Sequence, residues 1–113
     1  MFHFENKPIY TSIGVEKVKN HTQDGQLYFE KVGAQSIVFC QRDNNLYAFK
    51  NKCPHQGQPL EGGWCKEGKI VCPFHRYAFD LETGRGHGDA MFKYDVTIEE
   101  GKVVLWREKF VLF

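Results

Sequence analysis

The sequence lacks any long apolar run. Its first thirty residues contain no apolar stretch of signal-peptide length, and no segment approaches the roughly 20 apolar residues that a membrane span requires. We therefore expect a soluble protein that acts in the cytoplasm and has no membrane partner.

An excess of charge of either sign is also missing. Fifteen Lys and Arg residues stand against 14 Asp and Glu residues, which leaves a formal net charge of +1. A chain so nearly neutral has no long-range attraction for a phosphate backbone, so we expect no nucleic-acid partner.

Low-complexity tracts, repeats and Ser/Pro linkers are absent too, so nothing marks an internal domain boundary. A length of 113 residues is close to the common size of one domain, and 42% hydrophobic residues are typical of a globular protein. We expect a single domain over residues 1–113, present as a monomer or a weak oligomer.

Helical periodicity is scarce, and only Ser12 to Val18 has room for one helical turn. Short runs rich in β-branched and aromatic residues recur instead, separated by turn signals, two of which are short enough for hairpins. The expected strands are Leu27 to Val32, Ser36 to Gln41, Leu46 to Asn51, Lys69 to Cys72, Phe92 to Glu99 and Lys102 to Arg107. This pattern predicts an all-β, antiparallel fold.

One stretch, residues 51–84, departs from the strand pattern. It holds three of the four prolines and two pairs of metal-ligand residues, Cys53-Pro54-His55 and Cys72-Pro73-Phe74-His75. Because loops rich in Pro and Gly supply little core, we expect a metal centre to hold them in place. Four cysteines in a chain without a secretory signal also favour a metal role over two disulfides.

The pattern C-x-H, sixteen residues, C-x-x-H resembles the Rieske iron-sulfur family over CPHQGQPLEGG and CPFHRYAFDLETG. The resemblance implies an antiparallel β-sandwich with a small two-loop subdomain that binds one 2Fe-2S cluster. It also implies that Cys53 and Cys72 bind one iron, while His55 and His75 bind the other.

The resemblance further implies a Rieske-type ferredoxin, a one-electron carrier between a ferredoxin reductase and an oxygenase or similar acceptor, with no catalysis of its own. A small subunit of an assimilatory nitrite reductase is the alternative within the fold. A terminal oxygenase needs a second iron site and a longer chain. A zinc-stabilised binding module would use the same four ligands, although zinc fingers usually place both Cys before both His.

Several positions depart from the high-potential respiratory members of the family. Gln58 and Phe74 stand where those proteins have a disulfide, and Tyr77 and Phe79 stand where they have Ser and Tyr hydroxyl donors to the cluster sulfurs. Fewer donors stabilise the reduced cluster less, so we predict a reduction potential around or below about −100 mV.

The family commonly has Gly at the position of Arg76, and a third loop that often contains Pro is here Gly86-His87-Gly88-Asp89. Two cysteines lie outside the ligand pairs. We interpret Cys40, in the run SIVFC, as a buried strand residue, and Cys65 as a loop-packing residue with a redox thiol as the alternative.

Overall fold

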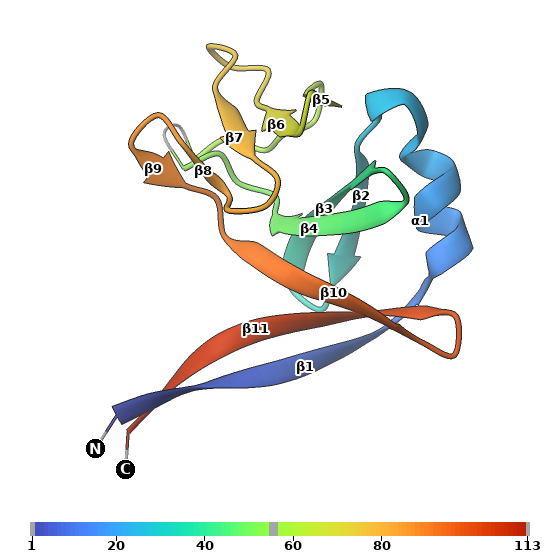
Figure 1. The fold of residues 1–113 in the computed structure, drawn as a ribbon, viewed down its shortest axis with the longest axis vertical. Coiled ribbons are helices and arrows are strands. Elements are labelled where there is room, and N and C mark those ends of the chain that lie inside the picture. Colours follow the sequence, from blue (N-terminus) through green and yellow to red (C-terminus); the bar gives the residue numbers. More distant parts are fainter. Residues whose placement is uncertain (1, 55–56, 113) are drawn as a thin grey trace.

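The computed structural model describes the backbone of residues 2–54 and 57–112 and the side chains of residues 6–54 and 57–107. The chain folds into antiparallel sheets with little helix, which confirms the predicted all-β class (Figure 1). In this part of the chain, no helix is long and apolar enough to cross a membrane.

The largest sheet has six strands in the order β1-β11-β10-β4-β3-β2. Its strands, in chain order, are β1 (Phe2–Gly14), β2 (Tyr28–Val32), β3 (Gln35–Arg42), β4 (Asn45–Lys50), β10 (Lys93–Glu99) and β11 (Lys102–Leu112). The long strands β1 and β11 pair from Phe2 with Leu112 to Gly14 with Lys102, so the two ends of the chain lie side by side (Figure 1).

A smaller sheet forms within residues 51–84 and lies next to β3 and β4, at the end of the molecule away from β1 and β11 (Figure 1). It contains β5 (Trp64–Lys66), β6 (Lys69–Val71) and β7 (Ala78–Asp80), in that order. Beside it, β8 (Arg85–Gly86) and β9 (Asp89–Ala90) make a two-stranded hairpin. The three-stranded sheet lies within the predicted segment 51–84, and the hairpin follows directly after it.

Within residues 2–54 and 57–112, helical structure is confined to one corner of the molecule. The helix α1 (Val15–His21) and the 3-10 turn η1 (Gln23–Gly25) connect β1 to β2. The helix begins three residues later than predicted because β1 continues to Gly14, where the Thr11 hydroxyl donates a hydrogen bond to the Val103 carbonyl and accepts one from the Ile13 N–H.

Strands β3 and β4 separate two cores. Four consecutive residues of β3 are buried, which is possible only where both faces of a strand are covered. Ile37 and Phe39 face one core with Ala48, whereas Val38 and Cys40 face the other. This second core, the site-side core, also contains Cys53, Leu60, Ile70, Cys72, Phe79 and Leu81.

Candidate metal centre

Two loops approach each other at the end of the molecule that carries the small sheet. The first loop follows β4 and leads to β5, and the second connects β6 to β7. Gly63, near the end of the first loop, lies so close to the second strand that an added Cβ would be 2.3 Å from the Val71 carbonyl oxygen and 3.2 Å from Pro73 Cδ. The two loops are therefore in direct contact.

The first loop is tied to the large sheet by Asn51, the residue that follows β4. Its side chain accepts a hydrogen bond from the Leu60 N–H at 2.7 Å and donates to Ser36 Oγ at 3.2 Å and Glu61 Oε1 at 2.8 Å. From the sequence, Asn51 was placed at the end of a strand and at the start of the stretch 51–84, with no role of its own. A polar residue at the end of a strand, two residues before a ligand pair, is the signal that could have identified this anchor.

Backbone hydrogen bonds shape both ligand loops. The Cys53 N–H donates to the Gln58 carbonyl at 2.8 Å, and the Gly57 N–H donates to the Cys53 carbonyl at 2.7 Å. In the second loop the Cys72 N–H donates to the Tyr77 carbonyl at 2.8 Å. His75 has φ 61° and Arg76 φ 55°, so the chain turns sharply between Cys72 and Tyr77.

The structure brings Cys53 and Cys72 together. Both are fully buried, and the Cys72 thiol donates a hydrogen bond to Cys53. Burial, followed by this contact, raises the pKa of the Cys72 thiol above its ordinary value, although a backbone hydrogen bond with Phe74 opposes the rise. Two adjacent buried thiols match the donor set of a thiolate-bound iron, which would displace their protons.

Of the two predicted histidine ligands, the structure describes only His75. His75 is exposed, and its ring centroid lies 5.9 Å from that of Tyr77. His55 lies outside the described residues. Among the side chains that are described, no three His, Cys, Asp or Glu groups gather closely enough to hold a metal ion.

A third segment packs beside the second ligand loop. His87 and Gly88 both have positive φ, 53° and 76°, and form the two-residue turn between β8 and β9. His87 Nε2 accepts a hydrogen bond from the Ala78 N–H at 3.1 Å, and its ring lies 4.7 Å from Tyr77 and 6.0 Å from Phe79 between centroids. The third loop, Gly86-His87-Gly88-Asp89, is thus a tight hairpin held to the second ligand loop.

The remaining cysteines are close to each other. Cys40 is fully buried on β3, as predicted, and its thiol donates a hydrogen bond to the half-buried Cys65 on β5. Sequence reasoning did not connect these two residues. Gln58 and Phe74, at the positions of the respiratory disulfide, leave the two ligand loops without that link.

Comparison with known proteins identifies the family. Residues 13–93 match the model of the Rieske [2Fe-2S] domain. Apoptosis-inducing factor 3 of Mus musculus is 30% identical over 102 residues, which cover 84% of this chain but only 17% of that protein. The ferredoxin component of the alkene monooxygenase system of Xanthobacter autotrophicus is 27% identical over 89 residues, covering 75% of this chain and 73% of that protein.

A solved structure has the same fold. The ferredoxin of carbazole 1,9a-dioxygenase from Nocardioides aromaticivorans superimposes with a TM-score of 0.71 at 20% identity, covering 88% of this chain and 96% of that one. The match extends over the large sheet as well as the small one. The chain therefore belongs to the Rieske [2Fe-2S] domain family, and its cofactor is a 2Fe-2S cluster.

Proposed function

We propose that this chain is a one-electron carrier that binds its cluster through Cys53, His55, Cys72 and His75 and passes electrons from a ferredoxin reductase to an oxygenase or similar acceptor. The contact between the buried thiols of Cys53 and Cys72 carries the proposal, because it joins two loops that are distant in sequence. The ferredoxin components of the alkene monooxygenase and carbazole dioxygenase systems support the choice of acceptor.

The burial of the three described ligand positions, Cys53, Cys72 and His75, agrees with different roles for the cysteines and the histidines. Cys53 and Cys72 would bind the inner iron, and His55 and His75 the outer iron. Burial of the thiols excludes water from the sulfur side, whereas the exposed His75 reaches solvent. The cluster, when bound, takes up and releases one electron at a time.

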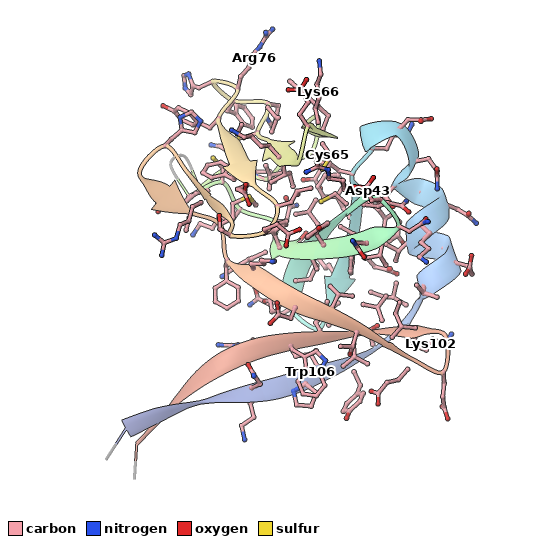
Figure 2. All side chains as sticks on the ribbon, in the orientation of Figure 1. Asp43, Cys65, Lys66, Arg76, Lys102 and Trp106 are labelled. Atoms are coloured by element: carbon pink, nitrogen blue, oxygen red, sulfur yellow. The ribbon has the colours of Figure 1, made fainter. Side chains whose placement is uncertain are left out.

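The surface around His75 fits a docking role for a redox partner. Phe74 is 43% exposed and Arg76 is exposed on its other side, at the far end of the molecule from the paired termini (Figure 2). An exposed aromatic ring supplies apolar contact area, and a guanidinium attracts carboxylates. We expect the acceptor to approach at this end.

We also propose a cytoplasmic location and a single domain over residues 1–113. All four cysteines are free of disulfide bonds, which is the usual state of cysteines in a reducing compartment. The pairing of β1 with β11 supports a single folding unit, since it joins the first and last strands within the sheet that also carries β3 and β4.

Metal and sulfide analysis of ligand variants tests the ligand assignment. We expect two irons and two inorganic sulfides per chain in the purified protein, and loss of most of both in Cys72→Ser and His75→Ala. Cys65→Ser is the matched control and retains both. Full iron content in the two ligand variants contradicts the assignment, and zinc without sulfide in the unmodified protein indicates a structural zinc site instead.

Electron carriage is tested separately, with the loaded protein. Anaerobic titration should consume one electron per cluster, and the reduced protein should be reoxidised on addition of an oxidised Rieske oxygenase. The carrier role is contradicted if no ferredoxin reductase reduces the loaded protein and no oxygenase of a panel reoxidises it. Such a result leaves the ligand assignment intact.

A further inference from the structure

Cys40 and Cys65 lie on different sheets. Cys40 pairs with Tyr47 across β3 and β4 of the large sheet, whereas Cys65 pairs with Ile70 across β5 and β6 of the small one. Their side chains meet between the two sheets, where the Cys40 thiol donates a hydrogen bond to the Cys65 sulfur. Figure 2 shows Cys65 at this junction. Neither residue belongs to a ligand pair.

The two thiols differ in access. Cys40 has no exposed surface, while Cys65 is half-buried and lines a hollow of about 110 Å³ together with Arg42, Lys66 and Gly68. A hollow of this size admits a small molecule but no peptide. A reagent from solvent therefore meets Cys65 first, and Cys40 only through it.

Positive charge lies beside the accessible thiol. The guanidinium of Arg42 covers the turn between β5 and β6, since a Cβ added to Gly68 would be 2.2 Å from Arg42 Nη1. The hydrogen bond from Cys40, followed by the charge of Arg42, lowers the pKa of Cys65 against the opposing effect of burial. The arrangement favours a thiolate at Cys65 and a protonated thiol at Cys40, as in an attacking and a resolving cysteine.

We propose that Cys40 and Cys65 form a peroxide-sensitive pair that closes a reversible disulfide between the two sheets. The Cys65 thiolate attacks one oxygen of hydrogen peroxide; an S–O bond forms, the O–O bond breaks, and the departing hydroxide takes a proton to become water. Cys40 sulfur then attacks Cys65 sulfur, the S–O bond breaks, and the second water leaves with the Cys40 proton. Two thiols lose two electrons in total, and one peroxide is reduced to two waters.

The disulfide would link the cluster-binding subdomain to the large sheet. Strand β5 pairs with β6, and Cys72 follows directly after β6. Cys65 packs against the core cluster that contains Cys40, so the bond would join two side chains of the same core. The oxidised chain would hold the second ligand loop against β3.

Titration of the cluster-loaded protein with hydrogen peroxide tests the proposal. Samples are quenched with an alkylating agent under denaturing conditions and digested, while visible absorbance reports the cluster. We expect a cross-link between the peptides of Cys40 and Cys65, reversed by dithiothreitol, before the cluster absorbance falls.

Two variants outside the ligand set separate the steps. In Cys40→Ala, the Cys65 sulfenic acid should persist and react with a 1,3-dione probe that leaves the unmodified protein unlabelled. In Cys65→Ser, Cys40 should remain reduced because no reagent reaches it. If the change at buried Cys40 impairs folding, the cross-linked peptides of the unmodified protein still test the proposal.

Three results would overturn the proposal. One is cluster bleaching with no Cys40–Cys65 cross-link, and another is a cross-link that joins Cys53 to Cys72 instead. The third is oxidation of Cys65 to the sulfinic acid while Cys40 can still be alkylated.

Discussion

Phe79 lacks the hydroxyl group that a tyrosine at this position would offer to a cluster sulfur. It is fully buried in the site-side core, pairs with Ile70 across β6 and β7, and lies edge-on to the ring of His87. A phenylalanine ring has no hydrogen to donate to a cluster sulfur. At the position where we expect a tyrosine in the high-potential respiratory members, this chain has an apolar side chain.

We predict a low reduction potential and its partial recovery in Phe79→Tyr. The unmodified protein should titrate around or below about −100 mV, in the lower part of the Rieske range. A new hydroxyl donor would stabilise the reduced cluster by about 1 kcal/mol, which corresponds to a rise of about 40 mV. A spectroscopic redox titration measures both values.

Phe39→Tyr is the matched control, because Phe39 is equally buried but faces the other core. It should leave the potential unchanged. A value above +100 mV for the unmodified protein, or equal shifts in the two variants, would refute the prediction.

The carboxylate of Asp80 accepts hydrogen bonds from backbone N–H groups. At the end of β7, its Oδ1 accepts hydrogen bonds from the N–H groups of Glu82 at 2.8 Å and Thr83 at 3.0 Å. The bond from Thr83, followed by that from Glu82, holds the pKa of Asp80 below its ordinary value. The charged form therefore stabilises the turn that leads to β8.

We predict that Asp80→Asn lowers the melting temperature at pH 7 and that the difference decreases in acid. A depressed folded-state pKa contributes stability above the ordinary pKa of 3.8, and this contribution is lost as the pH falls through the lower folded value. The asparagine oxygen still accepts both bonds, so the variant removes only the charge.

Thermal unfolding of the two proteins at pH 7, 5 and 3 provides the comparison. The difference should be the same at pH 7 and 5 and smaller at pH 3. Asp95→Asn, at an exposed position of β10, is the control and should change little at any pH. A deficit that persists undiminished in acid would mean that charge is not the cause.

At the scale of the elements, the close crossing of the two ligand loops depends on Gly63. A Cβ there would lie 2.3 Å from the Val71 carbonyl oxygen and 3.0 Å from that of Leu60. Both contacts are with backbone, which cannot yield as a flexible side chain does. Gly14, where β1 meets α1, has φ −71° and nothing within 4 Å of an added Cβ.

We predict that Gly63→Ala destabilises the fold by about 1–3 kcal/mol, the usual cost of overpacking, and lowers the iron content. Gly14→Ala should be neutral or slightly stabilising, because it removes freedom from the unfolded chain without a clash. Chemical denaturation and iron analysis of both variants measure the effects. Equal stability of the two would show that the loops can move apart at no cost.

The sequence predicted the regular strands and missed those that depend on long-range pairing. The apolar runs of β3 and β4 follow from residue type because both strands are covered by core. Strands β5 and β7 have only three residues each, too few for a period to show, and exist because they pair with β6. The polar segment of β1 is a strand because β11 pairs along its length.

At the scale of the whole molecule, the sequence predicted that the cysteines of one pair lie close together, but not those of the other. Cys53 and Cys72 each stand in a ligand motif, so their proximity was expected from the family. Cys40 and Cys65 have no motif, and they meet only because the small sheet packs on the β3 face that carries Cys40. The relative placement of two sheets is a property of core packing, which short sequence patterns do not encode.

The large sheet ends in two exposed edges, of which β1 is the longer. Near the middle of β1, the exposed Lys7 precedes Pro8, which pairs with Trp106 on β11. An open strand edge is a template for another strand. Proline removes one backbone hydrogen-bond donor from this edge, and lysine adds a charge to it. We therefore expect these two residues to disfavour pairing of this edge with a second copy.

We therefore predict that Pro8→Val promotes self-association through β1, since valine restores the N–H and favours strand structure. Sedimentation velocity should show a monomer for the unmodified protein and a concentration-dependent dimer for the variant. Pro8→Lys restores the same N–H but adds a charge, so it should remain monomeric. If both variants associate equally, the missing donor alone protects the edge; if neither does, the edge is protected by something other than Pro8.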